Sequence, residues 1–247
     1  MTRPEPILSV QGVTAGYNVI PVVHDITLHV GRGEAVALMG ANGAGKTTLL
    51  RAVSGLIRTM AGKVTLAGQD VTGLPAEALV RKGMSHVAEG RRIFRKMSVE
   101  DNLELGLAAM RLSRDERARR FDEQYDLFPM LRDKRQDAAG ALSGGQQQML
   151  AIAQALIRHP DVVMLDEPST GLAPIMVEEV FDKLATIRAR GVSILLIEQV
   201  VERTLQFVDH GYLMQGGRLI AEGTPEALNR SGSVRRAYMG DAAVMGG

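Results

Sequence analysis

The chain has 247 residues, of which 45% are hydrophobic and 23% are charged, and its formal net charge at pH 7 is +1. This length and composition are ordinary for one α/β domain with an added subdomain, and the near-neutral charge argues against a nucleic-acid partner, which usually calls for a strongly basic face. The absence of cysteine excludes disulfides and thiolate metal sites, and no apolar run approaches the ~20 residues that span a bilayer.

Strands dominate the first part of the chain. Segments rich in β-branched residues and separated by glycines predict strands over 7–13, 22–30, 35–39 and 63–67, with a further strand at 84–88. Helices are predicted over 46–54, where Gly55 is placed to end the helix, and over 75–82.

Residues 98–140 change in character and predict a helical subdomain inserted in the main fold. Ser98, followed by Glu100 and Asp101, is placed to start a helix, and residues 113–131 are predicted to be helical. Arginines and acidic residues alternate along this stretch, which favours a solvated helix with i,i+4 ion pairs over a nucleic-acid-binding face.

From Ser143 onward the pattern predicts α/β structure again. Ser143 is placed to cap a helix with one apolar face, and buried strands are predicted over 161–166 and 192–197 with an amphipathic helix between them. Strands that alternate with helices indicate a parallel sheet covered on both faces. The tail, from about residue 224, predicts a short helix and a Met/Gly-rich end whose composition is typical of disorder.

A phosphate-binding loop follows the strand at 35–39. The pattern G-x-x-x-x-G-K-[ST] is matched by Gly40, Ala41, Asn42, Gly43, Ala44, Gly45, Lys46 and Thr47, and we include the next residue, Thr48, in the predicted nucleotide site. Glycines let backbone N–H groups point at a polyphosphate, and the following helix offers its positive end. Lys46 can reach the β- and γ-phosphates, and the Thr47 hydroxyl can ligate Mg²⁺.

Two later segments carry related chemistry. The apolar strand at 162–165 ends in Asp166 and Glu167, and a buried strand would deliver Asp166 rigidly to Mg²⁺ through a coordinated water. A second anion site is predicted where a hydroxyl and unobstructed backbone amides meet a helix N-terminus, at Ser143, Gly144, Gly145 and Gln146.

The phosphate loop and the later run Leu142-Ser143-Gly144-Gly145-Gln146, in this order and at this spacing, resemble the ATP-binding cassette (ABC) ATPases. The resemblance implies a P-loop NTPase core with an antiparallel β subdomain and an inserted helical subdomain. It implies one nucleotide-binding domain over 1–247, with the helical subdomain at about 98–140 and a tail at about 224–247. It also implies that the second motif closes over ATP held by a second ATPase subunit, in a homodimer or a heterodimer.

The resemblance assigns further roles in ATP hydrolysis. Glu167 matches the general base for the attacking water, and Tyr17 matches an aromatic residue that stacks on adenine. Such stacking is worth about 1–3 kcal/mol by analogy with other base–aromatic contacts, and the alternative is an ordinary core or surface tyrosine. The guanine-reading pattern Asn-Lys-x-Asp is absent, which argues against a GTPase.

Two departures from the common ABC pattern narrow the resemblance. Glu89 stands where most members have a glutamine, and Gln199 stands where most have a histidine. They resemble the smaller ATPase subunit of importers for branched-chain amino acids, or for the closely related amides and urea. Glu89 then faces the Mg²⁺ and Gln199 the γ-phosphate. Because glutamine cannot become a cation, hydrolysis at this site is hypothesised to be slow.

The expected function is ATP hydrolysis that energises import of branched-chain or other hydrophobic amino acids through membrane permease subunits. We expect the protein on the cytoplasmic face of the membrane, since its N-terminus lacks a signal peptide, with a periplasmic solute-binding protein as an indirect partner. The segment after Glu89 is expected to meet a permease helix through Arg91, Arg92, Ile93, Phe94 and Met97. Open alternatives are a urea or short-amide importer, a soluble ABC ATPase outside transport, and a catalytically silent regulatory subunit.

Overall fold

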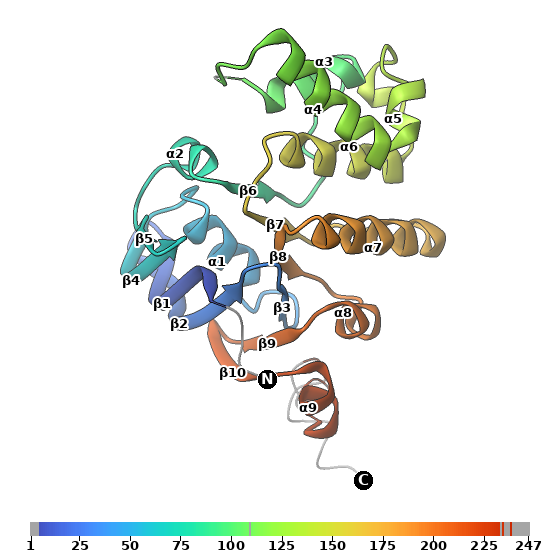
Figure 1. Cartoon of the computed structure of the whole chain (residues 1–247). Coiled ribbons are helices and arrows are strands. Elements are labelled where there is room, and N and C mark those ends of the chain that lie inside the picture. Colours follow the sequence, from blue (N-terminus) through green and yellow to red (C-terminus); the bar gives the residue numbers. More distant parts are fainter. Residues whose placement is uncertain (1–4, 109, 233, 235–237, 239–247) are drawn as a thin grey trace.

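The fold combines two sheets, several helices that cover them and a separate layer of helices (Figure 1). The computed structural model describes residues 5–108, 110–232, 234 and 238. The α/β fold class predicted from the sequence is confirmed, with a P-loop core and an antiparallel sheet beside it. The disorder predicted for the Met/Gly-rich end falls mostly on residues outside the described part of the chain.

The smaller sheet is antiparallel and has the strand order β2-β1-β4-β5. Its strands are β1 (Pro6–Tyr17), β2 (Ile20–Gly31), β4 (Thr59–Leu66) and β5 (Gln69–Asp70). Gly62 lies where β4 crosses β1 closely, because a Cβ there would come within 2.4 Å of the carbonyl oxygen of Gly12. One face of this sheet packs on the helix α1 (Lys46–Val53), so the two share a hydrophobic core.

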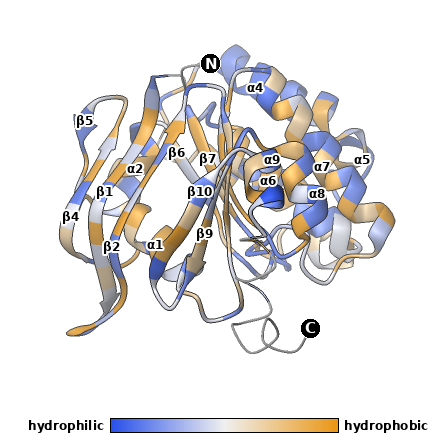
Figure 2. Ribbon diagram, turned by 90° about the horizontal axis from the view of Figure 1, so that it is seen from below, coloured by the Kyte–Doolittle hydropathy of each residue, from blue (hydrophilic) through white to orange (hydrophobic). Residues whose placement is uncertain are grey.

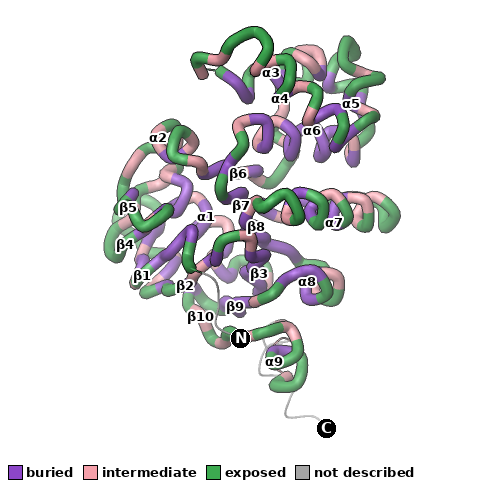
Figure 3. Tube along the Cα trace, in the orientation of Figure 1, coloured by how far each residue is buried: buried purple, intermediate pink, exposed green. Residues whose placement is uncertain are grey.

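The larger sheet has six strands in the order β10-β9-β3-β8-β7-β6. They are β3 (Ala35–Met39), β6 (Met84–Val87), β7 (Val162–Asp166), β8 (Ser193–Ile197), β9 (His210–Gln215) and β10 (Arg218–Gly223). All pairings are parallel except that of β10 with β9. Every residue of β3, β7 and β8 is buried (Figure 3), which explains their continuous apolar runs.

Helices cover the larger sheet on both faces. Besides α1, they are α2 (Ala76–Arg81), α7 (Pro174–Ala189), α8 (Val201–Phe207) and α9 (Pro225–Arg230). The helix α7 shows hydrophobic and hydrophilic residues side by side (Figure 2), and Val180, Phe181 and Leu184 from its inner face are buried. The helix α8 and the β9–β10 hairpin were not predicted from the sequence. Within the described residues, no helix is both long and apolar enough to cross a membrane.

The separate helical layer contains α3 (Val99–Gly106), α4 (Arg114–Leu127), α5 (Pro129–Asp133), a 3₁₀ turn η1 (Ala139–Ala141) and α6 (Gly144–Leu156). Ser98 caps α3 and forms a capping box with Asp101, as the sequence predicts. The helical structure predicted over 113–131 is present, but it is divided into two helices that meet at Phe128. Pro129 begins the second helix because its ring cannot continue the first. The predicted i,i+4 pairing is present between Arg120 and Glu116 at 3.3 Å.

Candidate nucleotide-binding and hydrolysis site

The candidate site lies where three neighbouring parallel strands end. The phosphate loop follows β3, Asp166 and Glu167 stand at the end of β7, and Gln199 follows β8, which lies between the other two. Ligands of open parallel sheets bind at this edge. A cleft of about 370 Å³ opens there, lined by Val22, Asn42, Gly43, Gly45, Lys46, Thr47, Thr48, Glu89, Glu167 and Gln199. The fold thus brings together residues from five separate parts of the sequence.

The phosphate loop owes its shape to its glycines. Gly45 is the N-cap of α1 with φ +103°, and Gly43 has φ +80°, values that favour glycine. A Cβ on Gly40 would come within 2.2 Å of the carbonyl oxygen of Met214, so this position also needs the missing side chain. No side chain caps the N-terminus of α1. Its first N–H groups and its positive dipole end therefore suit an anion such as a nucleotide phosphate.

Lys46 lies at the centre of the cleft. Its Nζ donates hydrogen bonds to the carbonyl oxygens of Gly40 at 2.8 Å and Ala41 at 3.1 Å. It also lies 4.0 Å from Oε1 of Glu167. Burial lowers the pKa of Lys46, and the negative charges of Glu167, Asp166 and Glu89 oppose this shift. A cation shielded from water in this way gains strongly from a polyphosphate placed against it.

The side chains beside Lys46 fit a magnesium ion. The Thr47 hydroxyl donates a hydrogen bond to Oδ1 of Asp166 at 3.1 Å. Burial, against the hydrogen bond from Thr47 and together with the charges of Glu167 and Glu89, raises the pKa of Asp166 to about 6. A divalent cation would stabilise the ionised form of this carboxylate. Mg²⁺ prefers oxygen ligands and is usually held by one or two carboxylates together with phosphates. Glu89 lines the same cleft and is exposed to solvent.

Glu167 is held by two donors at the mouth of the cleft. Its Oε2 accepts hydrogen bonds from Nε2 of Gln199 at 2.6 Å and from the Thr170 hydroxyl at 3.1 Å. Its backbone has φ +49°, which side-chain-bearing residues rarely adopt, and its N–H donates to the carbonyl oxygen of Ile197 at 2.9 Å. An oriented carboxylate beside a phosphate site can accept a proton from water.

Tyr17 lies beside α1, outside the residues that line the cleft. The residue is 42% exposed, and its hydroxyl accepts a hydrogen bond from Nη1 of Arg51 at 3.0 Å. A hydrogen bond with Thr48 and the nearby Arg51 lower the pKa of Tyr17. A fixed and exposed aromatic ring next to the phosphate loop is compatible with base stacking, which stays a prediction.

The second predicted anion site begins helix α6. Ser143 is its N-cap, and Ser143 and Gln146 form a reciprocal capping box. Two other side chains lie close to the glycines between them. A Cβ on Gly144 would lie 2.6 Å from the Arg91 guanidinium, and a Cβ on Gly145 would lie 2.2 Å from Met176. None of these four predicted residues lines the cleft at the phosphate loop. Within one chain the two anion sites therefore remain apart.

Arg91 connects the loop after Glu167 with the start of α6, and the sequence did not predict this connection. Its Nη2 donates hydrogen bonds to the carbonyl oxygens of Thr170 at 3.3 Å and Gly171 at 3.1 Å. The side chain thus connects the loop after Glu167 with the start of α6. The expected contact of Arg91 with a permease stays a prediction.

Tyr238 in the tail also reaches the site. Its hydroxyl accepts a hydrogen bond from the N–H of Gly40 at 3.1 Å and donates one to the carbonyl oxygen of Glu198 at 3.4 Å. Burial raises the pKa of Tyr238, so it stays a neutral donor. No sequence pattern links a tail tyrosine with a loop 198 residues away, and Tyr238 was not predicted.

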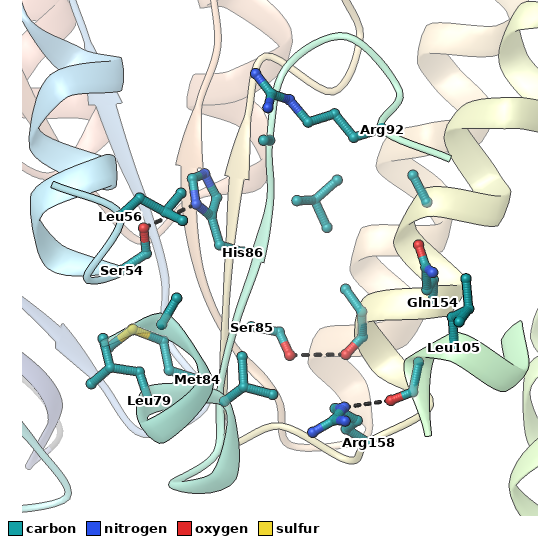
Figure 4. Close-up of a pocket in the computed structure, with 17 residues that line it drawn as sticks. Ser54, Leu56, Leu79, Met84, Ser85, His86, Arg92, Leu105, Gln154 and Arg158 are labelled. Atoms are coloured by element: carbon teal, nitrogen blue, oxygen red, sulfur yellow. Dashed lines mark hydrogen bonds between the residues drawn. The ribbon is translucent and has the colours of Figure 1, made fainter. Parts of the chain in front are cut away.

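A second cleft of about 400 Å³ lies between β6 and the helical layer (Figure 4). His86 reaches into it from β6, and its Nδ1 shares a hydrogen bond of 3.1 Å with the Ser54 hydroxyl. Burial lowers the pKa of His86 to about 4, so the ring is neutral at pH 7. Arg92 stands at the rim of this groove, whereas Phe94, which is 57% exposed, does not line it.

The groove is mostly apolar, and none of the described residues that line it is acidic. Its walls are formed by Ser54, Leu56, Ala76, Leu79, Val80, Met84, Ser85, His86, Val87, Ala88, Arg92, Leu105, Gly106, Ala151, Gln154, Ala155 and Arg158. Arg158 is tied to the end of α3, because it donates to the carbonyl oxygens of Gly106 and Ala108. Of the segment expected to meet a permease, Arg92 alone among the described residues lines this groove.

Several ATP-binding proteins of transport systems are similar to this chain over nearly its whole length. The high-affinity branched-chain amino acid transport ATP-binding protein BraG of Pseudomonas aeruginosa is 39% identical over 234 residues, which cover 95% of this chain and 100% of that protein. The probable branched-chain amino acid transport ATP-binding protein LivF of Archaeoglobus fulgidus is 36% identical, with 92% and 96% covered. The lipopolysaccharide export system ATP-binding protein LptB of Haemophilus influenzae is 34% identical, with 95% and 98% covered.

Solved structures share the fold. A nucleotide-free ATP-binding cassette from an ABC transporter matches with a TM-score of 0.84 at 24% identity, with 98% of each chain covered. A post-hydrolysis dimer of another cassette, bound to ADP and phosphate, matches with a TM-score of 0.78 at 23% identity, with 88% and 98% covered. The family model described as ABC transporter matches residues 23–170. The chain therefore belongs to the ATP-binding subunits of ABC transporters, which bind and hydrolyse ATP.

Proposed function

We propose that this protein energises the import of branched-chain or other hydrophobic amino acids. The observation that carries the proposal is the cleft in which Glu89, Glu167 and Gln199 face Lys46, since Glu89 and Gln199 are the two departures typical of that subgroup. The identity with BraG along its whole length supports the same solute class. A urea or short-amide importer remains the nearest alternative within this subgroup.

The geometry supports a division of labour in ATP hydrolysis. The N–H groups of the phosphate loop and the Lys46 ammonium bind the phosphates, while Tyr17 stacks on the adenine. Thr47, Asp166 and Glu89 would hold Mg²⁺, which supplies charge neutralisation at the β- and γ-phosphates when bound. Glu167 accepts the proton of the attacking water. Gln199 holds this carboxylate through the 2.6 Å hydrogen bond and faces the γ-phosphate.

The separation of the two anion sites supports a head-to-tail dimer. Ser143 and its neighbours lie outside the cleft of their own chain, so a second ATPase subunit would present them to the nucleotide. Each ATP would then be held by the phosphate loop of one subunit and by the N-terminus of α6 from the other. The partner is either a second copy of this chain or a different ATPase subunit.

The groove beside β6 is the proposed docking site for a permease. Its apolar walls suit a short amphipathic helix, and Arg92 and Arg158 suit an acidic residue on that helix. The helical layer around residues 98–140 would act as a subdomain that carries this groove toward the membrane. We place the protein on the cytoplasmic face, where ATP is available, with a periplasmic solute-binding protein as an indirect partner.

Uptake by cells that lack the protein tests the solute class. We expect deletion to abolish high-affinity uptake of labelled leucine, isoleucine and valine, and the wild-type chain, but not Lys46→Ala, to restore it. Labelled urea and acetamide uptake are measured in parallel. Loss of urea or acetamide uptake alone would reassign the solute class.

Lipopolysaccharide export is the second candidate function, because LptB proteins are also similar over nearly the whole chain. The same deletion strain separates the two functions. Normal amino-acid uptake together with lipopolysaccharide accumulating in the inner membrane would favour export.

A further inference from the structure

A buried carboxylate lies directly behind the proposed catalytic pair. Glu198, between β8 and Gln199, has a side chain that is completely buried. Its Oε1 accepts a hydrogen bond from the N–H of Ser169 at 2.8 Å. Its Oε2 accepts one from the Ser169 hydroxyl at 2.8 Å and one from the N–H of Gln199 at 3.1 Å. One side chain thus joins the loop after β7 to the loop after β8.

The hydrogen-bond partners of Glu198 suit its ionised form. The pKa of this carboxyl group is nevertheless raised, because burial outweighs the hydrogen bonds from Ser169 and Gln199, and the charge of Glu167 adds to the rise. All three partners present N–H or O–H bonds to it, as an ionised acceptor requires. Burying a charge costs stability compared with an apolar side chain of similar size. A carboxylate at this position therefore calls for a role other than packing.

The contacts of Glu198 lead to Glu167. The two donors that hold the Glu167 carboxylate are the side chains of Gln199 and Thr170. Glu198 binds the backbone of Gln199 itself and both the backbone and the hydroxyl of Ser169, the neighbour of Thr170. Both donors are therefore anchored to the same buried group, and a shift of that group would turn Glu167 away from its position.

We propose that Glu198 is a positioning residue for ATP hydrolysis, which acts on the general base by fixing Ser169 and Gln199. It acts through other residues, since neither Glu198 nor Ser169 lines the cleft at the phosphate loop. The inference rests on the role proposed above for Glu167. It predicts that loss of Glu198 lowers the rate of hydrolysis while the affinity for nucleotide is kept.

The test compares Glu198→Gln and Ser169→Ala in the purified full-length protein. Glutamine keeps the shape of Glu198, but its amide NH₂ would face N–H and O–H groups of Ser169 and Gln199 that are themselves donors, so hydrogen bonds would be lost. We expect kcat for Mg-ATP to fall by about 10²-fold for Glu198→Gln and by about tenfold for Ser169→Ala, because small misplacements of a catalytic group are costly. KM for ATP should stay within about twofold. The double variant should be no slower than Glu198→Gln, because both changes break the same connection.

Glu34→Gln is the matched control. Glu34 is similarly buried and accepts a hydrogen bond from the N–H of Gly31 at 2.6 Å, but it precedes β3 and so lies at the opposite end of that strand from the phosphate loop. We expect it to lower thermal stability and leave kcat unchanged. If Glu198→Gln does not fold, Ser169→Ala decides the question.

Glu167→Gln separates this inference from the role on which it rests. Wild-type kcat in Glu198→Gln or Ser169→Ala, together with an inactive Glu167→Gln, would overturn the positioning role alone. An active Glu167→Gln would overturn the proposed general base. Equal losses of kcat in Glu34→Gln and Glu198→Gln would reduce Glu198 to a structural residue.

Discussion

Lys46 is the residue on which nucleotide binding depends most directly. It is buried, donates hydrogen bonds to two carbonyl oxygens of its own loop, and lies near the negative charges of Glu167, Asp166 and Glu89. We expect Lys46→Ala to abolish tight Mg-ATP binding and to leave the fold intact. Titration calorimetry measures the affinity, and circular dichroism checks the fold. Unchanged affinity would contradict the nucleotide site.

Glu167 is expected to separate binding from hydrolysis. Glu167→Gln keeps the shape and the hydrogen bonds to Gln199 and Thr170 but removes the proton acceptor. Hydrolysis should fall by roughly 10²–10⁴-fold, whereas ATP binding should survive. Dimers that trap ATP should then accumulate in size-exclusion chromatography. Full turnover by a homodimer of this variant would remove Glu167 from the mechanism.

Gln199 offers a test of the slow-site hypothesis. Its amide donates a neutral hydrogen bond to Glu167 at 2.6 Å, whereas a histidine could donate a charge-assisted bond of about twice the strength. We expect Gln199→His to raise kcat by up to about tenfold, measured across Mg²⁺ concentrations because Glu89 adds negative charge to the same cleft. An unchanged or lower rate would mean that the glutamine belongs to a fully competent site.

At the scale of elements, the groove beside β6 connects the hydrolysis domain with its proposed membrane partner. Leu56, 55% exposed, lies on one wall and Arg92 on the rim. We expect the double variant Leu56→Ala, Arg92→Glu to abolish amino-acid transport in proteoliposomes that contain the permease, with ATP affinity unchanged. The control is Phe94→Ala, an exposed apolar residue outside the groove, which should keep transport. Equal transport by the wild-type protein, the double variant and Phe94→Ala would exclude docking at this groove.

The sequence predicted the elements that local patterns specify. The buried strands β3, β7 and β8 read as continuous apolar runs, and Ser98 and Ser143 cap the helices α3 and α6. The break at Pro129 and the β9–β10 hairpin were missed. The turn at 216–217 is a local signal, because a Gly-Gly pair between two apolar runs is typical of a hairpin, and it was overlooked. Only the pairing of β9 with β3 lies outside any local window.

The candidate site was predictable only in part: its motif residues were predicted, and the residues that support them were not. Residues such as Lys46 and Asp166 belong to recognisable sequence motifs, and these motifs were sufficient to predict that both residues lie in one nucleotide site. Glu198, Arg91 and Tyr238 were not recognised, because their roles depend on hydrogen bonds between segments that are distant in sequence. Residues that contact a motif residue in space, but lie far from it in the sequence, can be identified only once the fold is known.

At the scale of the whole molecule, the separation of the two anion sites predicts that hydrolysis needs two subunits. Each active site would combine the phosphate loop of one chain with the N-terminus of α6 from another. Lys46→Ala destroys the first half of a site. Ser143→Asp destroys the second, because aspartate still caps α6 but places a negative charge against the nucleotide.

Mixing the two inactive variants tests this arrangement. In a mixed head-to-tail dimer both changes meet in one site, and the other site contains an intact Lys46 and an intact Ser143. An equal mixture should therefore recover about a quarter of the wild-type ATPase rate, since half of the dimers are mixed and each has one working site of two. Each variant alone, at the same total concentration, is the control. If the mixture stays inactive, copies of this chain do not share sites, and a second, different ATPase subunit must supply the α6 N-terminus that completes the site.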